Sequence, residues 1–381
     1  GYNATGSLKI TKKVDKADPS YSPDAETQFD IKVVLEGNGA NGTYTYTIDG
    51  NASDSYKFKS GAVITLKNGQ TAEIEGLPAG CKYTVSEPTP PDGYTSNIDA
   101  PAGVIAAGKV QDTAPVVTVT NTYKPSDVTL SGSTSLAGEK ILNGRAWLAS
   151  DQFDFQLEAV DAKNTPMPKV SLIQLQSEGT AAGTPVPFHF GDITYTKPGT
   201  YIYDINEIIP SNGIIGISYD STIYRVTVTV TDDQKGHLTA AASMQNLSDK
   251  STAELATFTN TFAAKDETLV LEAIKQFVDK GGNALTQTSG QFNFKLDKSQ
   301  VDENNNQLSA DHDPPMPASA DAASNALGRV TYVLNYNSTH DLNNTYYYQL
   351  SEVDTKLANI TYSKERYLIK VEFTVGPEDG E

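Results

Sequence analysis

In one stretch of eight residues, threonine alternates with mainly apolar side chains from Val117 onward: Val116-Val117-Thr118-Val119-Thr120-Asn121-Thr122-Tyr123. Because side chains at i, i+2 and i+4 of a β-strand share one face, this period of two predicts a strand. Asn121 falls on the same face as Val117, Val119 and Tyr123. The stretch therefore predicts a core strand that carries one amide side chain inward.

The same alternation recurs along the chain, and turn residues separate the alternating segments. Short strands divided by turns are typical of β-sandwiches, so the fold class that we expect is all-β. A short helix is expected only within Ala318–Ala326. The other expected strands are Leu8–Val14, Phe29–Leu35, Tyr83–Glu87, Phe153–Leu157, Tyr201–Glu207, Tyr224–Val230, Phe292–Leu296, Tyr346–Glu352 and Tyr367–Val375.

Three kinds of predicted strand recur three times along the chain in the same order, which indicates tandem domains. A strand with a lysine comes first, an aromatic strand follows, and a Tyr-rich strand that ends in Glu comes next. The first two repeats close with Thr-Asn-Thr and an aromatic residue, at 120–123 and 259–262. We expect three β-sandwiches, at 1–124, 125–263 and 264–381. The lack of a long linker between them favours an elongated rod.

The third repeat lacks its closing strand within this sequence. The lysine and the asparagine of each of the first two repeats are about 110–120 residues apart. The same spacing from Lys275 places the matching asparagine at about position 390, beyond Glu381. We therefore expect 264–381 to lack its C-terminal strand.

Each repeat places a lysine and a glutamate on an apolar strand face, and the first two add an asparagine. Lysine and glutamate are almost never fully buried without partners, so the pattern predicts a buried polar set. The candidate residues are Lys12, Glu87 and Asn121 in the first repeat, Lys140, Glu207 and Asn260 in the second, and Lys275 and Glu352 in the third.

Burial would favour the neutral forms of both ionisable groups, since desolvation lowers the pKa of lysine and raises that of glutamate. A neutral amine can attack the carbonyl carbon of a neighbouring amide, and a protonated carboxyl can move the protons. Ammonia leaves, and an amide crosslink remains between Lys and Asn. The glutamates Glu87, Glu207 and Glu352 would be catalytic, once per domain, so the protein is not expected to be a turnover enzyme.

Another interpretation is a buried Lys–Glu ion pair in each repeat. A single lysine in phase with apolar residues is usually a side chain that extends its charged end to solvent. An ion pair would account for two of the three residues but not for the asparagine at the same place in two repeats. The recurrence of the whole set favours the crosslink.

The sequence resembles two kinds of Gram-positive surface domain. The segment from Tyr83 to Tyr94 resembles the E-box of pilins and CnaB-type domains. The second repeat resembles the streptococcal-type pilin isopeptide-linkage domain, in Lys140, Gly144-Arg145, Gly199–Tyr203, Glu207 and Phe258–Asn260. The third repeat is similar up to about Val375. The resemblance implies Lys–Asn isopeptide bonds within Ig-like sandwiches. A Tyr-Pro-Lys pilin motif and an LPxTG-like signal are not found in this sequence.

The composition argues against several classes of partner and site. A formal net charge of −18 argues against nucleic acid as a partner, and no apolar run reaches the ~20 residues of a membrane span. A single cysteine, Cys81, allows no intrachain disulfide. Four scattered histidines show no metal-ligand spacing, and we expect no metal and no cofactor.

These features predict a structural subunit of a Gram-positive pilus, located outside the cell on the cell wall. The expected partners are neighbouring pilin subunits or the cell wall, joined by a sortase, and host surface ligands. Two alternatives remain open, namely the stalk of a cell-wall-anchored adhesin and a glycan-binding surface module. An exposed aromatic platform would favour the second alternative.

Overall fold

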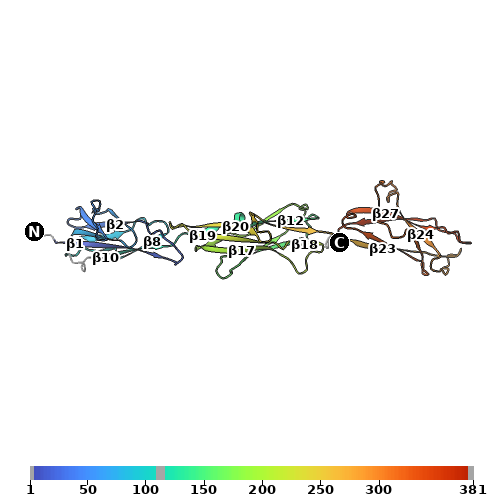
Figure 1. Ribbon diagram of the computed structural model, residues 1–381, viewed down its shortest axis with the longest axis horizontal. Coiled ribbons are helices and arrows are strands. Elements are labelled where there is room, and N and C mark those ends of the chain that lie inside the picture. Colours follow the sequence, from blue (N-terminus) through green and yellow to red (C-terminus); the bar gives the residue numbers. More distant parts are fainter. Residues whose placement is uncertain (1–3, 109–115, 376–381) are drawn as a thin grey trace.

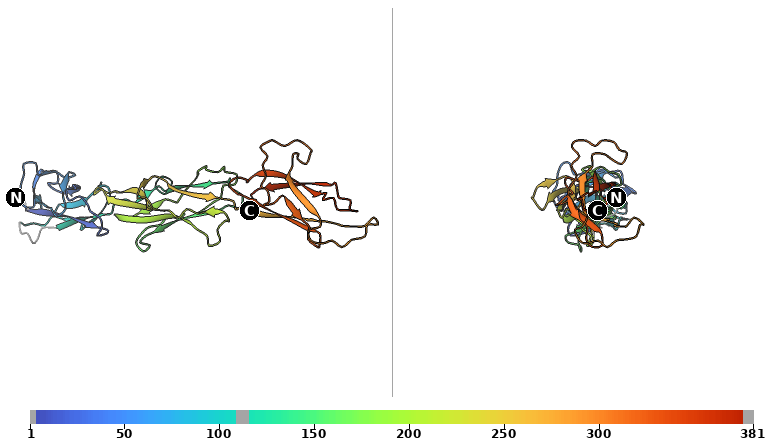
Figure 2. Two further views of the ribbon diagram at one scale, coloured as in Figure 1. Left: turned by 45° about the vertical axis from the view of Figure 1, so that its right-hand side comes forward. Right: turned by 90° about the vertical axis from the view of Figure 1, so that its right-hand side faces the viewer.

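The computed structural model describes residues 4–108 and 116–375. The strands form three successive groups along one long axis (Figure 1). Figure 2 shows the same elongated arrangement from a second side and end-on. The all-β prediction is confirmed: among the described residues the one α-helix is the four-residue α1 (Gly132–Ser135). We refer to β1–β10 as the first unit, β11–β22 as the second and β23–β28 as the third.

Two facing sheets make up the first unit, with strand orders β4-β3-β6-β1-β10-β8 and β5-β2-β7-β9. Leu8 and Ile10 of one sheet pack with Ile31 and Val33 of the other in one buried cluster. The strands are β1 (Thr5–Lys16), β2 (Phe29–Glu36), β3 (Tyr44–Ile48), β4 (Lys57–Phe58), β5 (Val63–Leu66), β6 (Thr71–Pro78), β7 (Lys82–Ser86), β8 (Tyr94–Asp99), β9 (Ala102–Val104) and β10 (Val116–Tyr123).

The second unit pairs a sheet of order β15-β12-β22-β18 with one of order β14-β13-β17-β19-β20-β21, and β11 pairs with β16. Its core is rich in aromatic side chains, among them Trp147, Phe155 and Phe258. The strands are β11 (Val128–Leu130), β12 (Ala137–Asn143), β13 (Phe153–Ala159), β14 (Leu172–Leu175), β15 (Val186–His189), β16 (Ile193–Tyr195), β17 (Gly199–Ile208), β18 (Ile217–Ser218), β19 (Ile223–Asp232), β20 (Leu238–Asn246), β21 (Thr252–Ala253) and β22 (Ala256–Phe262).

The third unit contains a two-stranded sheet, β23-β26, and a sheet of order β25-β24-β27-β28. A separate cluster that includes Phe292, Leu334 and Tyr348 forms its core. The strands are β23 (Glu267–Ile274), β24 (Asn293–Lys298), β25 (Asp321–Ala323), β26 (Arg329–Tyr336), β27 (Asn344–Val353) and β28 (Arg366–Phe373).

The expected helix within Ala318–Ala326 is wrong, because β25 occupies the middle of that segment. Asp321–Ala323 pairs with β24 at the edge of its sheet. The helix propensity of alanine is worth only a few tenths of a kcal/mol per residue, so a strand that completes a sheet edge overrides it.

In the first two units the first and last long strands are parallel neighbours. The Cα partner of Lys12 in β10 is Val119, two residues before Asn121. The Cα partner of Lys140 in β22 is Phe258, two residues before Asn260. The same register thus places a lysine and an asparagine on the same face of adjacent strands in both units.

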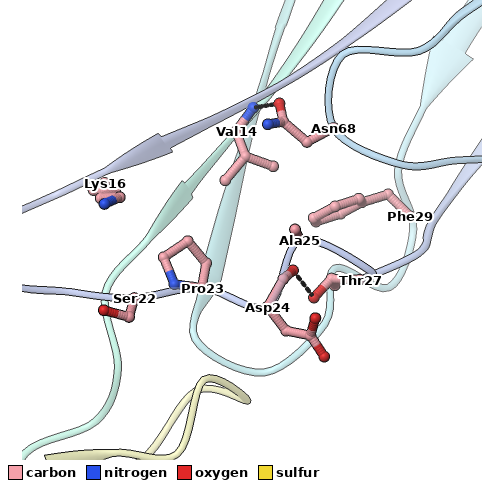
Figure 3. Close-up of a pocket in the computed structure, with 9 residues that line it drawn as sticks. All are labelled: Val14, Lys16, Ser22, Pro23, Asp24, Ala25, Thr27, Phe29 and Asn68. Carbon is pink, nitrogen blue, oxygen red and sulfur yellow. Dashed lines mark hydrogen bonds between the residues drawn. The ribbon is translucent and has the colours of Figure 1, made fainter.

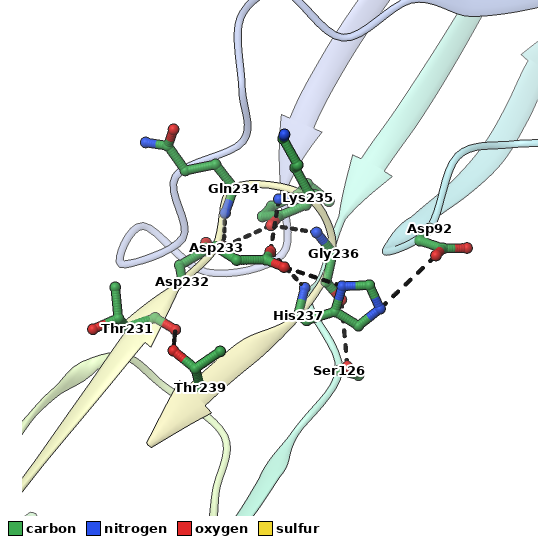
Figure 4. A network of polar contacts seen from close by, with 11 residues as sticks. Asp92, Ser126, Thr231, Asp232, Asp233, Gln234, Lys235, Gly236, His237 and Thr239 are labelled. Carbon is green, nitrogen blue, oxygen red and sulfur yellow. Dashed lines mark hydrogen bonds and ion pairs between the residues drawn. The ribbon is translucent and has the colours of Figure 1, made fainter. Parts of the chain in front are cut away.

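Direct contacts join the first unit to the second. The hydroxyl of Tyr123 donates to Asp232 Oδ1 at 2.6 Å and accepts from the backbone N–H of Gly236 at 3.0 Å. Ser126 and His237 form a parallel β-bridge, and His237 lies between Asp233 and Asp92 (Figure 4). These bonds hold the β19–β20 turn of the second unit against the end of the first.

Candidate functional site

The second unit brings its three predicted residues into one buried network. Lys140 of β12 donates to Glu207 Oε2 at 2.8 Å, and Asn260 of β22 donates through Nδ2 to Glu207 Oε1 at 2.7 Å. Glu207 reaches them from β17 in the facing sheet. Lys140 and Asn260 are fully buried and Glu207 is 3 % exposed. One carboxylate therefore contacts both the amine and the amide nitrogen.

Burial shifts both ionisable groups of this network toward their neutral forms. It lowers the pKa of Lys140 to about 8, against the opposing attraction of Glu207. It also raises the pKa of Glu207, with Lys140 and the hydrogen bond from Asn260 acting in the other direction. The neutral amine and the carboxylic acid are thus accessible together, as attack on an amide requires.

The first unit collects the same three residue types with a different hydrogen-bond pattern. Asn121 Nδ2 donates to Glu87 Oε1 at 2.9 Å, but Lys12 donates to the backbone oxygens of Lys13 and Val119. Glu87 Oε2 is buried without a hydrogen-bond partner among the described residues. Desolvation lowers the pKa of Lys12 to about 8. The nucleophile, the carboxyl and the amide are present, and the Lys–Glu bond is not made.

Of the three neighbouring lysines of β1, Lys12 alone is buried, at 1 % exposed, as its position in the alternation predicts. Lys13 is exposed and Lys9 is half-buried. The apolar face of β1 therefore carries Lys12 and directs its neighbours outward.

The third unit contains the lysine and the glutamate as an ion pair. Lys275 Nζ lies 2.8 Å from Glu352 Oε2, with side-chain exposures of 12 % and 3 %. The two residues line an open pocket of about 620 Å³. Among the described residues β23 pairs only with β26, and no parallel strand lies where β10 and β22 lie in the other units. The site has no asparagine partner there.

A phenylalanine beside each lysine is a feature that sequence reasoning missed. The lysine Nζ lies 4.0 Å from the ring centroid of Phe29 in the first unit, 4.8 Å from that of Phe153 in the second and 4.6 Å from that of Phe292 in the third. Each of these residues opens the aromatic strand of its repeat, so their recurrence was the available signal. The rings exclude water from the amine and help to desolvate it.

The other features of the described residues contain fewer reactive groups than the three lysine sites. A pocket of about 320 Å³ beside Val14 and Phe29 contains no buried ionisable side chain, and its charged residues Lys16 and Asp24 are at least partly exposed (Figure 3). Within residues 4–108 and 116–375, no group of three or more metal-ligating side chains is found. No helix in that part of the chain is long and apolar enough to cross a membrane.

The structure is thus a chain of tandem β-sandwiches, two of which bring a lysine, a glutamate and an asparagine together in the core. The family described as "Spy0128-like isopeptide containing domain" (FctA) matches residues 136–263 and 271–381, and the chain belongs to this family. Residues 6–123 match a domain of unknown function, DUF7601.

Individual relatives are pilus proteins. A "Pilin" of Streptococcus pyogenes serotype M1 is 30 % identical in a match of 122 residues. The match covers 27 % of this chain and 35 % of that relative, so the chain spans about a third of the relative's length. The major pilin of Streptococcus pyogenes is 20 % identical over 60 % of this chain and 84 % of its own, with a TM-score of 0.31. The pilus-presented adhesin Cpa is 23 % identical over 32 % of this chain and 28 % of its own, with a TM-score of 0.24.

Proposed function

We propose that this chain is a structural subunit of a surface pilus whose first two units close themselves with Lys–Asn isopeptide bonds. The observation that carries the proposal is the position of Glu207 between Lys140 and Asn260, at 2.8 and 2.7 Å. A carboxyl in that place can take a proton from the attacking amine and supply one to the departing ammonia. Membership of an isopeptide-containing family supports the proposed Lys–Asn bonds.

The proposed architecture is three sandwiches, at 1–124, 125–263 and 264–381. Lys12–Asn121 and Lys140–Asn260 are the proposed bonds, with Glu87 and Glu207 as their catalytic acids. In the third unit Lys275 donates to both oxygens of Glu352, and a crosslink there would require an asparagine supplied by another strand.

Intact mass tests the crosslinks. The purified chain should be lighter than its sequence by the mass of two ammonias, and peptide mapping should recover Lys12 joined to Asn121 and Lys140 joined to Asn260. An unshifted mass would mean that these lysines form ion pairs or hydrogen bonds alone, and the proposed chemistry would be wrong.

Assembly into a fibre is the second part of the proposal, with neighbouring subunits or the cell wall joined through a sortase at the cell surface. The pilin relative and the elongated shape support it. Antibodies against this chain should detect a covalent ladder of high-mass species in cell-wall extracts of the organism that carries the gene. A single band would favour a stalk of a wall-anchored adhesin instead.

A further inference from the structure

Both ends of the Asn260 side chain are fixed by hydrogen bonds. Nδ2 donates to Glu207 Oε1, and Oδ1 accepts from the backbone N–H of Asp220 at 2.8 Å. A backbone N–H can only donate, so the atom facing it must be the amide oxygen. The carbonyl that the lysine would attack is therefore already polarised by a donor on its oxygen.

The path of the chain around Asp220 explains why its N–H points inward. β18 pairs with β22 at Ser218 and Thr261 and ends there, and the chain then leaves the sheet. The Asp220 carboxylate accepts from the N–H of Thr259 at 2.8 Å and from that of Thr222 at 2.9 Å. These bonds fix Asp220 against the strand that carries Asn260, so the donor is held in place before any reaction.

We propose that the backbone N–H of Asp220 is the oxyanion donor for crosslink formation in the second unit. This inference rests on the proposed Lys140–Asn260 bond and assigns it a further catalytic group. Preorganised donors of this kind stabilise charge that develops in the transition state, and they act most strongly in a buried site.

The reaction begins from the neutral pair, with Lys140 as an amine and Glu207 as a carboxylic acid. Nζ attacks Cγ of Asn260, a C–N bond forms, and the carbonyl electron pair moves onto Oδ1. The Asp220 N–H stabilises the negative charge on Oδ1 by donating a hydrogen bond to it. Glu207 gives its proton to Nδ2 and takes one from Nζ. The Cγ–Nδ2 bond breaks, ammonia leaves, the carbonyl re-forms, and Glu207 ends protonated as it began.

The carboxylate of Asp220 supports this assignment. Its two oxygens are engaged by the N–H groups of Thr259 and Thr222. Its negative charge contributes to the raised pKa of Glu207, although burial is the larger cause, and it opposes to a lesser degree the lowering of the Lys140 pKa by burial. The same residue thus helps to keep the acid protonated through its side chain and stabilises the oxyanion through its backbone.

The first unit has no equivalent donor among the described residues. Asn121 Oδ1 is buried without a hydrogen-bond partner. There the neighbouring strand β8 stays paired with β10 from Tyr94 to Asp99, so no loop residue turns an N–H toward the amide. The first unit should consequently form its crosslink more slowly than the second.

The decisive experiment removes the Asp220 N–H alone. Cell-free synthesis of the full chain with an α-hydroxy acid at position 220 replaces this N–H by an ester oxygen and retains the side chain. The matched control has an ester at position 222, which removes the Thr222 N–H bond in the same loop but contacts no reacting atom. Ammonia loss is followed over time by intact mass, and peptide mapping assigns each loss to its unit.

The ester at position 220 should slow crosslinking of the second unit by about 100-fold or more, as loss of one oxyanion donor does, while the ester at 222 has a much smaller effect. In the unmodified chain the second unit should react before the first, a comparison that needs no variant. Equal rates for the two esters, or a first unit that reacts as fast as the second, would overturn the inference. No ammonia loss in the unmodified chain would overturn the proposed crosslink itself.

Discussion

Lys140 and Asn260, far apart in sequence, donate hydrogen bonds to the two oxygens of the same buried carboxylate. The parallel pairing of β12 with β22 places them on one face, and β17 brings Glu207 between them from the opposite sheet. An ion pair needs only the lysine and the carboxylate. The second contact, to the amide that would lose ammonia, is the one that would allow the site to form a crosslink.

Replacing Glu207 with Gln should leave the second unit uncrosslinked, because an amide of the same size cannot act as the acid. The variant should retain one ammonia by intact mass, assigned to Lys140 and Asn260 by peptide mapping, while the first unit still reacts. Glu158→Gln, at an exposed carboxylate on β13, is the control and should match the unmodified chain. Full crosslinking in Glu207→Gln would contradict the role of the carboxyl.

The crosslinking rate of the second unit should be level near neutral pH and fall above about pH 8. The neutral Lys140–Glu207 pair and the ion pair hold the same number of protons, so the ratio of these two forms does not depend on pH. The rate should therefore stay level as long as the pair keeps this number of protons. The pKa of Lys140 is lowered to about 8 by burial. Above it the pair loses the proton that the leaving ammonia needs, and the rate should drop about tenfold per pH unit.

The measurement is ammonia loss over time after synthesis at a series of pH values. A rate that keeps rising above pH 8 would mean that the free amine beside an ionised Glu207 is the reactive form. The first unit gives a second profile in the same spectra, since the pKa of Lys12 is also lowered to about 8.

Loss of the second crosslink should lower the free energy of unfolding of that unit by about 4–5 kcal/mol, the chain-entropy value for a closed loop of this length. Asn260→Ala tests this by denaturant unfolding against the unmodified chain, and Asn121→Ala is the matching change in the first unit. Because the chain has one cysteine, a thiol reductant should leave the stability of the unmodified protein unchanged. Stability equal to that of the unmodified chain would show that the loop is not closed.

The joint between the first two units should loosen when Tyr123 is replaced with Phe. This change removes the hydroxyl that donates to Asp232 and accepts from Gly236, and such bonds contribute about 0.5–3 kcal/mol each. Small-angle scattering should show a shorter maximum dimension as the units bend. Tyr201→Phe removes a hydroxyl that bonds to Lys197 within the second unit and should leave the scattering unchanged.

Alternation of side chains was sufficient to predict much of the fold and the site. Lys12, Lys140, Asn121 and Asn260 are buried because each is in phase with its apolar neighbours, and a period of two leaves little choice of face. For the third unit, the spacing predicts that 264–381 lacks a closing strand, and this stays a prediction; within the described residues β23 pairs only with β26.

Other parts of the site had no such signal. The donor at Asp220 is a backbone group, and any residue but proline would provide it, so only the course of the loop after β18 reveals it. The bonds from Lys12 to backbone oxygens depend on side-chain torsions that alternation does not specify. The prediction of a short helix within Ala318–Ala326 was wrong because strand pairing at a sheet edge is a non-local effect, which a local sequence pattern does not show.

The parallel register of the first and last strands has a consequence for the way a protease would affect the proposed fibre. With the proposed bond in place, tension enters the first unit along β1, crosses from Lys12 to Asn121 and leaves through Tyr123 into the second unit. Every loop between Lys12 and Asn121 lies on a closed ring beside that path. A protease that cuts one of these loops opens the ring, yet the two ends of the unit stay covalently joined. These loops can therefore change in sequence, or be cut, while the covalent path through the unit remains continuous.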